Sequence, residues 1–373
     1  MLPTRPTSVR RRFGAVAAVA LSAATLAGVT LPAQAPADAS TSLPSARRAN
    51  PDNPLAGRPW GVYKGPQDQS WAPYVAATGA EKTLLGKIAL RPKAKWFGAW
   101  IANSKISSTV DKYIANAAGG DENTLVQMTV FRMKPWEGSA CTRLPTAAEQ
   151  ASYKDWINKF AAAVGSQHTA IILQPDGPFA LCVPGGSKVP TSLIAYSARV
   201  FSALPNTSVY IDGGTWDWPY KAPAKAASFL VADGIKYTRG FALNSTHYGR
   251  VEDDIDFGTQ VVAELAKRGV SGKHFVISTS SNGQGFEFNK ARGGGSRDNA
   301  KVCQSFVERV CVALGIPPTT DVANPKWGMS ATRQARAATN VDGYLWFGRP
   351  WLYMQSDPFV KSRALDLARY TPW

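Results

Sequence analysis

Short apolar runs alternate with helix-like patterns along most of this 373-residue chain, and this alternation constrains the fold more than any other feature. The apolar runs cover residues 95–101, 125–131, 169–175, 207–211, 240–243, 274–279 and 343–347. Most are rich in β-branched or aromatic residues, and each is short enough for a buried parallel strand. Helical patterns lie near residues 107–118, 146–164, 191–204, 222–233, 256–268, 297–313 and 359–370. The alternation predicts an α/β fold with a parallel sheet, and seven units around one core favour a (β/α) barrel over a doubly wound sheet.

The first 39 residues have the pattern of an export signal rather than of a folded domain. Arg5 and three consecutive arginines at 10–12 precede an apolar run over residues 14–31, and a small-x-small site ends at Ala39. Both Sec and twin-arginine export fit this pattern, and an uncleaved anchor is the alternative, although the run is only marginally long enough to span. We therefore expect a secreted protein with a signal at 1–39, a short spacer at 40–53 and one catalytic domain at 54–373.

The formal charge of +16 is partly a property of the signal. Removing residues 1–39 leaves 38 basic and 25 acidic residues and a formal charge of +13. The remaining positive charges are spread along the chain without a basic run, and no nucleic-acid-binding motif accompanies them. A basic surface therefore indicates an anionic or cell-envelope glycan rather than nucleic acid as a partner.

The four cysteines indicate two disulfides, because an even number in an exported chain is typical of an oxidising compartment. The sequence alone allows three pairings among Cys141, Cys182, Cys303 and Cys311. With only three histidines the chain has little room for a zinc cluster, so we expect no metal and no cofactor.

Carboxylates and tryptophans gather where a barrel places its chemistry, on the loops after the strands. Asp176 follows the strand at 169–175, and Asp212 follows the strand at 207–211. Apolar neighbours around Asp176 favour a general acid, although both residues also suit an ordinary turn. Acids that cleave a glycosidic bond and flat rings that stack on sugars together indicate a glycan hydrolase.

Other polar clusters have simpler explanations. The acidic cluster at 252–254 precedes a helix and is typical of residues that interact with its dipole. His247 lies on a strand-end loop, where it suits a hydrogen bond to substrate rather than a metal. The chain has no Gly-x-Ser-x-Gly elbow, which argues against a serine hydrolase.

The chain resembles glycoside hydrolase family 6, which comprises inverting endo-β-1,4-glucanases and cellobiohydrolases. The resemblance runs from residue 53 to about residue 357. Its most specific stretches are 87–96 (KIALRPKAKW), 171–176 (IILQPD), 203–214 (ALPNTSVYIDGG), 240–244 (GFALN), 272–279 (GKHFVIST) and 343–346 (GYLW). The family fold is a distorted, incomplete barrel of parallel strands, so the resemblance implies that architecture with about seven strands.

The resemblance implies roles for individual residues. Asp176 matches the family's proton donor, with Gln174 in place of a Glu, and Asp212 matches the Asp that ends the fourth strand. Substrate-binding side chains are expected at Trp96, Trp218, Asn244, Tyr248, Asn282 and Trp346. The family's pattern also implies a Cys141–Cys182 disulfide and leaves Cys303 to pair with Cys311.

The chain departs from the family at several positions. Glu137 is the available substitute for an Asp that assists the donor, and Asp357 is the expected base in a loop that lacks the family's Lys and Glu. Ser278 and Ser281 replace an Asp and an Arg, and Thr215 replaces a His. The sequence predicts a secreted, monomeric, inverting β-1,4-glucan hydrolase. A non-catalytic glycan-binding protein and a hydrolase of another β-linked envelope polysaccharide are the alternatives.

Overall fold

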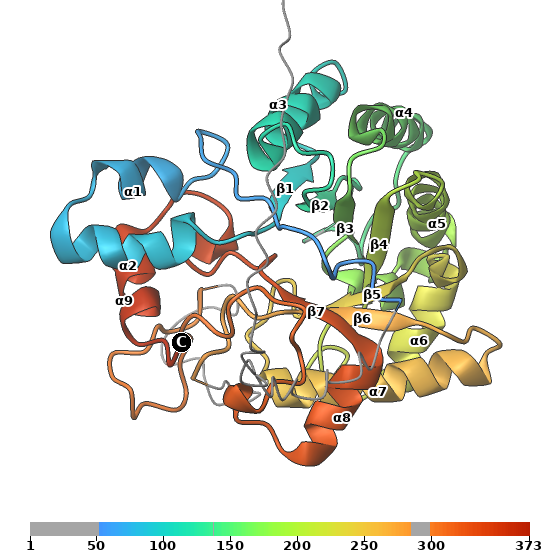
Figure 1. Ribbon diagram of the computed structural model, residues 1–373. Coiled ribbons are helices and arrows are strands. Elements are labelled where there is room, and N and C mark those ends of the chain that lie inside the picture. Colours follow the sequence, from blue (N-terminus) through green and yellow to red (C-terminus); the bar gives the residue numbers. More distant parts are fainter. Residues whose placement is uncertain (1–51, 137, 285–298) are drawn as a thin grey trace, which may run out of the picture. The chain divides into compact units, whose positions relative to one another are not determined.

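One parallel sheet forms the centre of the computed structural model, which describes residues 52–136, 138–284 and 299–373. Seven strands in these ranges follow the chain order without exception. They are β1 (Lys95–Gly98), β2 (Val126–Phe131), β3 (Thr169–Leu173), β4 (Thr207–Asp212), β5 (Gly240–Leu243), β6 (His274–Ser278) and β7 (Val341–Leu345). Every neighbouring pair is parallel. The sheet curves into a half-barrel (Figure 1), which confirms the predicted α/β incomplete barrel.

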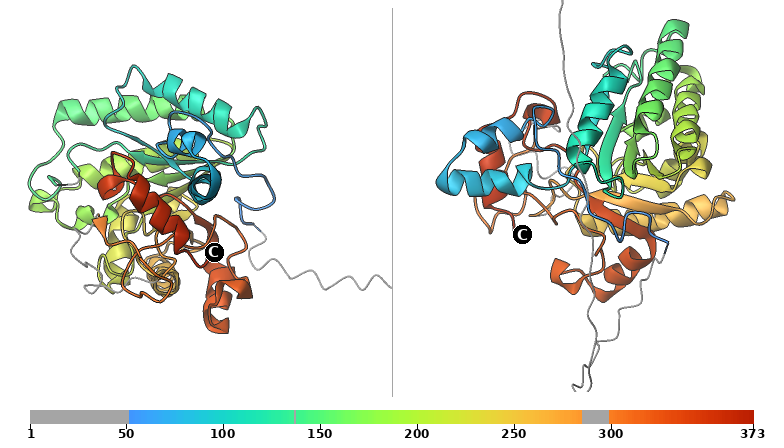
Figure 2. Two further views of the ribbon diagram at one scale, coloured as in Figure 1. Left: turned by 90° about the vertical axis from the view of Figure 1, so that its left-hand side faces the viewer. Right: turned by 45° about the horizontal axis from the view of Figure 1, so that its top comes forward.

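Helices connect successive strands and lie on the outer side of the sheet (Figure 2). The connecting helices are α3 (Ile106–Ala118), α4 (Ala147–Val164), α5 (Val189–Ser202), α6 (Pro223–Ala232), α7 (Val251–Lys267) and α8 (Ala331–Asn340). Two helices, α1 (Trp71–Ala76) and α2 (Gly79–Ala89), precede β1, and α9 (Lys361–Arg369) packs against α2. The sequence did not predict α1, α2 or α8.

Two apolar layers hold the sheet in place. The outer layer lies between the strands and the helices and includes Val130, Ile171 and Phe241, all fully buried. The inner layer fills the concave side, and its members include Ala170, Ile172, Tyr210, Val276, Phe347 and Leu55, which precedes α1. Because the strands are buried on both faces, their consecutive residues are apolar, and this made the strands recognisable in the sequence.

The two edge strands of the sheet come together without forming a strand pair. Ala94, just before β1, donates its N–H to the Trp346 carbonyl oxygen just after β7 at 2.8 Å. The Trp96 indole N–H donates to the Phe347 carbonyl oxygen at 2.7 Å. We call this junction of β1 and β7 the seam. It joins segments about 250 residues apart in the chain.

The helix predicted at 297–313 is wrong over residues 299–313, which are irregular. Cys303 and Cys311 form a disulfide there, with their Cα atoms 4.9 Å apart. Eight residues of α-helix would separate these atoms by about 12 Å, at about 1.5 Å per residue. The disulfide and a continuous helix are therefore incompatible. Both predicted disulfides, Cys303–Cys311 and Cys141–Cys182, are confirmed.

A buried ion pair joins the amino-terminal ends of β5 and β7. Asp342 on β7 has no exposed side-chain surface, and Arg239 donates to both of its oxygens at 2.8 and 2.9 Å. The Tyr210 hydroxyl on β4 donates to the same carboxylate at 2.7 Å. These hydrogen bonds offset the free-energy penalty of burying the Asp342 carboxylate.

Candidate functional site

Asp176 and Asp212 lie side by side at the carboxyl end of the sheet. Asp212 ends β4, and Asp176 follows the neighbouring strand β3, so parallel pairing brings both residues to the same edge. The Gly177 N–H, directly after Asp176, donates to Asp212 Oδ1 at 3.0 Å. A Cβ at Gly177 would lie 2.2 Å from the Asp212 carbonyl oxygen, so this close approach requires glycine.

Asp212 is a buried carboxyl held by hydrogen bonds. It is 1% exposed and accepts from the Gly214 N–H at 2.9 Å and from the Ser245 hydroxyl. Burial raises the pKa of Asp212 to about 6, while the hydrogen bonds from Ser245, Gly177 and Gly214 oppose the rise. Asp212 therefore changes its charge near pH 6.

We expect Asp212→Asn to stabilise the protein in alkaline but not in acidic solution. The native pKa of about 6 exceeds the ordinary value of 3.8, so the stability linked to proton binding is lost as the pH rises from 3.8 through 6. Near neutral pH the gain is about 3 kcal/mol at about 1.36 kcal/mol per pKa unit. Urea unfolding at about pH 4 and about pH 8 measures it, with the exposed Asp111→Asn as control. An equal effect of Asp212→Asn at both pH values would contradict the expectation.

Asp176 is linked to the loop after β7 through Thr246. Asp176 is 9% exposed, and the Thr246 hydroxyl donates to its Oδ1 at 2.7 Å. The Thr246 carbonyl oxygen accepts a hydrogen bond from Gln355 Nε2 at 2.5 Å. Gln355 Oε1 accepts one from the backbone N–H of Arg349 at 3.2 Å. The chain of contacts runs from the predicted donor to the loop that carries Asp357.

His247 forms a second polar contact beside the two carboxylates. Its Nδ1 lies 2.9 Å from Asp217 Oδ1, and its ring stacks on Trp218 with the centroids 5.2 Å apart. Burial lowers the pKa of His247, but the hydrogen bond and charge of Asp217, with the charges of Asp176 and Asp212, raise it overall. A protonated imidazole here partly offsets the negative charge of the site. Trp218 is half-buried.

The loop after β2 reaches Asp176 from the other side. The Trp136 indole N–H donates to the Pro175 carbonyl oxygen at 3.0 Å, and the Cys141–Cys182 disulfide joins this loop to the one after β3. The predicted helper Glu137 lies outside the described residues. Its neighbour Trp136 nevertheless fixes the start of that loop against the donor segment.

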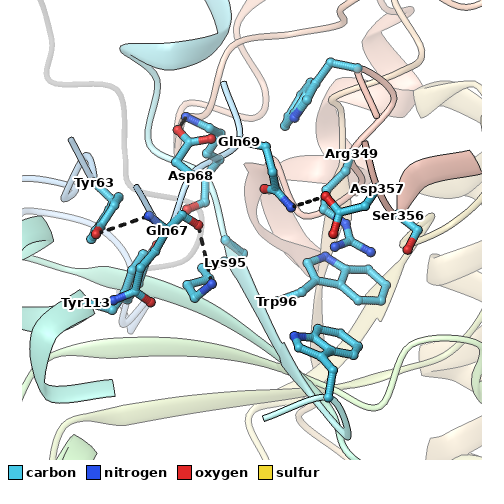
Figure 3. Close-up of a pocket in the computed structure, with 14 residues that line it drawn as sticks. Tyr63, Gln67, Asp68, Gln69, Lys95, Trp96, Tyr113, Arg349, Ser356 and Asp357 are labelled. Atoms are coloured by element: carbon cyan, nitrogen blue, oxygen red, sulfur yellow. Dashed lines mark hydrogen bonds and ion pairs between the residues drawn. The ribbon is translucent and has the colours of Figure 1, made fainter. Parts of the chain in front are cut away.

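A pocket of about 270 Å³ lies across the seam (Figure 3). Trp96, Lys95 and Trp100 line it from the β1 side, and Arg349 and Asp357 line it from the loop after β7. Asp357 is exposed and accepts from Gln69 Nε2 at 3.2 Å. The Arg349 guanidinium carbon lies 4.0 Å from the centroid of the Trp96 ring. The expected base and a predicted sugar-stacking ring thus share this pocket.

Four predicted substrate-binding residues have little exposed surface. Asn244, Asn282, Tyr248 and Trp346 are 1%, 8%, 2% and 2% exposed. The Asn244 amide donates to the Gly249 and Ser278 carbonyl oxygens, and the Trp346 indole N–H donates to the Ile316 carbonyl oxygen at 3.0 Å. Asn244 and Trp346 thus support the backbone around them, and the contact of the four residues with substrate stays a prediction.

The acidic cluster at 252–254 lies in the first turn of α7, as expected, but Asp254 also has a structural contact. It is fully buried and accepts from the Thr215 hydroxyl at 2.8 Å and from the Trp216 N–H at 3.0 Å. Burial raises the pKa of Asp254 to about 8, against these hydrogen bonds. Thr215, where the family pattern has a His, therefore anchors its loop to α7.

Several residues of the site were not singled out in the sequence. Ser245 and Thr246 contact the predicted carboxylates, Lys95 and Arg349 line the pocket, and Gln355 connects Thr246 with Arg349. Ser245 and Thr246 lie between Asn244 and His247, on a loop that directly follows a predicted strand. Their position at the end of that strand was the signal that could have identified them. Among the described residues, no group of three or more His, Cys, Asp or Glu side chains is placed to hold a metal ion.

Comparisons with known proteins fit this arrangement. Residues 63–343 match the sequence model of the family described as Glycosyl hydrolases family 6. Endoglucanase 1 of Streptomyces halstedii is 29% identical over 231 residues, which are 60% of this chain and 70% of that protein. Endoglucanase A of Cellulomonas fimi is 30% identical over 229 residues, which are 60% of this chain and 47% of that protein. The chain thus spans about half the length of the second relative.

Solved structures share the architecture. The endoglucanase Cel6 of Mycobacterium tuberculosis, in complex with methyl-cellobiosyl-4-deoxy-4-thio-β-D-cellobioside, is 25% identical with a TM-score of 0.66 over 85% of this chain and 99% of that one. Cellobiohydrolase II of Humicola insolens is 17% identical with a TM-score of 0.57, over 79% and 85% of the two chains, and supports the fold alone. The family match covers more than half of the sequence, and the half-barrel agrees with it. This chain belongs to glycosyl hydrolases family 6 and is a glycoside hydrolase.

Proposed function

We propose that this chain hydrolyses β-1,4-linked glucan with inversion of the anomeric carbon. The observation that carries the proposal is the Asp176 and Asp212 pair, bridged by the Gly177 N–H at the carboxyl end of the sheet. Family membership and relatives named endoglucanases support the same substrate class. Inverting enzymes use an acid and a base about 6.5–9.5 Å apart, with the attacking water between the base and the sugar.

Asp176 is the proposed general acid. It donates a proton to the leaving glycosidic oxygen as the bond from that oxygen to the anomeric carbon breaks. The Thr246 hydroxyl donates to Oδ1 of this carboxyl at 2.7 Å and fixes its orientation. Asp212 is the proposed partner that adjusts the proton affinity of Asp176, and Glu137 is a proposed helper.

Asp357 is the proposed general base. A water molecule attacks the anomeric carbon from the opposite face and gives its proton to this carboxylate. Its exposure leaves access for water, and the Gln69 amide orients the carboxylate. The contacts from Arg349 through Gln355 to Thr246 support a fixed relation between this loop and Asp176.

We also propose that the protein acts outside the cell after removal of residues 1–39 and that it is a monomer. Two disulfides support an oxidising compartment. Among the described helices, none combines the length and the apolar character needed to cross a membrane. The domain proposed for residues 54–373 then carries the whole cleft.

Product analysis tests the proposed reaction. We expect reducing sugar from swollen cellulose and mixed-linkage glucan, and proton NMR of a soluble cello-oligosaccharide digest is expected to show the α-anomer first. Chitosan and cell-envelope glycans are the comparison substrates. Early β-anomer would contradict inversion. Binding without release of reducing sugar from any glycan would favour the alternative of a non-catalytic glycan-binding protein, which the altered loop after β7 makes a specific candidate.

A further inference from the structure

A groove of about 480 Å³ runs along α5 and shares no lining residue with the pocket at the seam. Its walls come from α4, α5 and the segment 232–237, in the layer of helices outside the sheet (Figure 1). Three lining residues are basic, Lys154, Lys188 and Arg199, and none is acidic. All three are exposed. Lys188 is the N-cap of α5, whose first turn has no acidic residue, so the positive end of the helix dipole adds to their charge.

The acidic side chains nearest to this groove in the sequence do not neutralise it. Glu149 on α4 binds Arg143 at 2.7 Å, and Asp155 binds Lys159 at 2.8 Å. Asp233, at the end of α6, is fully buried, and burial raises its pKa well above the usual value, which favours its neutral form. The groove along α5 is therefore an open surface with an excess of positive charge.

Tyr196 holds two of the cations over the groove. The Lys154 amine lies 5.6 Å and the Arg199 guanidinium carbon 6.0 Å from the centroid of its ring, both within the range of a cation–π contact. The Tyr196 hydroxyl donates to Asn158 Oδ1 at 2.7 Å, which ties the ring on α5 to α4. A ligand therefore meets two cations that are already placed, and less free energy is lost in ordering their long side chains.

The cations are spread along the groove rather than clustered at one point. Lys188 and Arg199 are separated by about 16 Å of helix, at about 1.5 Å per residue. A nucleic-acid strand carries a negative charge about every 3.4 Å, so most of its phosphates over this length would lack a basic partner. A polysaccharide with a single carboxylate on each sugar is charged more sparsely and matches the groove better. Tyr237, which is 42% exposed, adds an aromatic ring of the kind that stacks on sugars.

We propose that this groove binds an acidic polysaccharide whose sugars carry carboxylates, and that it holds the protein on such a polymer. The groove contains none of the residues assigned to hydrolysis, so the proposal is independent of the proposed function. Arg199 forms paired hydrogen bonds with one carboxylate, while Lys154 and Lys188 pair with carboxylates of other sugars. The formal charge of +13 that remains after removal of residues 1–39 favours the same partner.

Binding of two matched polymers tests the proposal. A β-1,4-glucan oxidised to a carboxylate at C6 is the acidic polymer, and hydroxyethyl cellulose is the neutral one. Calorimetry uses the Asp176→Asn protein, so that neither polymer is cleaved during the measurement. We expect the acidic polymer to bind about tenfold or more tightly, and added salt to reduce this preference because the cations are exposed.

A triple variant removes the cations of the groove. In the same protein, Lys154→Gln/Lys188→Gln/Arg199→Gln is expected to lower the affinity for the acidic polymer about tenfold or more, because three ion contacts are lost. Its affinity for the neutral polymer should not change. The melting temperature shows whether the fold is kept.

A second triple variant separates the groove from attraction by net charge. Lys64→Gln/Arg91→Gln/Lys112→Gln also removes two lysines and one arginine, all exposed and none in the lining of the groove. This control should bind the acidic polymer as the parent protein does. An equal loss in both triple variants would overturn the assignment of the groove.

The remaining outcomes separate this proposal from the proposed function and from other partners. Equal affinity for the two polymers, or no binding of the acidic one, would overturn the polysaccharide site and leave β-glucan hydrolysis intact. Groove-dependent binding by an enzyme that hydrolyses no glucan would support the site and overturn hydrolysis. Single-stranded DNA and polyphosphate are the comparison ligands, and tighter groove-dependent binding of either would overturn the choice of a polysaccharide.

Discussion

Asp176→Asn is expected to lower kcat/KM on β-1,4-glucan by about 10²–10⁴-fold, the usual contribution of a general acid. Asn keeps the shape of the side chain and accepts the hydrogen bond from Thr246, but it has no proton to give to the leaving oxygen. Reducing-sugar kinetics measure the loss, and the melting temperature shows whether the fold is kept. KM should change little, because the lost interaction belongs to the transition state.

A substrate with a good leaving group separates proton donation from other roles of Asp176. The dinitrophenolate group of a dinitrophenyl glycoside leaves without protonation. Asp176→Asn is therefore expected to retain most of its activity on such a substrate. The exposed Asp111→Asn on α3 is the matched control and should behave as the unmodified enzyme on both substrates. An equal loss on both substrates would mean that Asp176 is not the acid.

Arg239→Met is expected to lower the free energy of unfolding by about 3–5 kcal/mol, because it leaves the Asp342 carboxylate buried without its main partner. Arg239 donates two hydrogen bonds to a carboxylate with no exposed surface, and the variant removes both while the Tyr210 hydroxyl at 2.7 Å and the more distant His274 Nδ1 at 3.6 Å stay in place. Urea unfolding at neutral pH, followed by circular dichroism, measures the loss.

Two further variants test the cause of this loss. Arg333→Met breaks a more exposed pair with Asp256 and should cost less than about 1 kcal/mol. The double variant Arg239→Met/Asp342→Leu replaces the whole pair with apolar groups and should recover most of the stability. If the double variant is as unstable as Arg239→Met, lost packing rather than a buried charge explains the effect.

The strands were predictable because their burial on both faces produces continuous apolar runs, and Asp176 and Asp212 followed from their positions at strand ends. The structure of residues 299–313 was not predicted correctly. The spacing of their apolar residues resembles that of a helix, while the Cys303–Cys311 disulfide imposes a compact loop. That disulfide was itself expected, so the two predictions conflicted. The covalent constraint takes precedence over the helix-like spacing of the apolar residues.

The details of the cleft depend on the directions of side chains, which position in the sequence does not give. Asn244 adopts a left-handed backbone conformation, with φ of 67°, and turns its amide into the loop rather than toward the groove. Trp346 points into the protein, while Trp96, at the other side of the seam, borders the pocket. The contact of Arg349 with Trp96 arises only when β1 and β7 come together. The meeting of β1 and β7 in the folded protein therefore decides which tryptophan borders the pocket.

The seam also sets when the pocket comes into existence. One wall is made by residues 63–113 and the other by residues 349–357, so translation produces them at nearly opposite ends of the domain. A nascent chain that ends before β7 already has Asp176 and Asp212 but lacks the wall that holds Arg349 and Asp357. The pocket is therefore complete only after the loop at 349–357 has been synthesised.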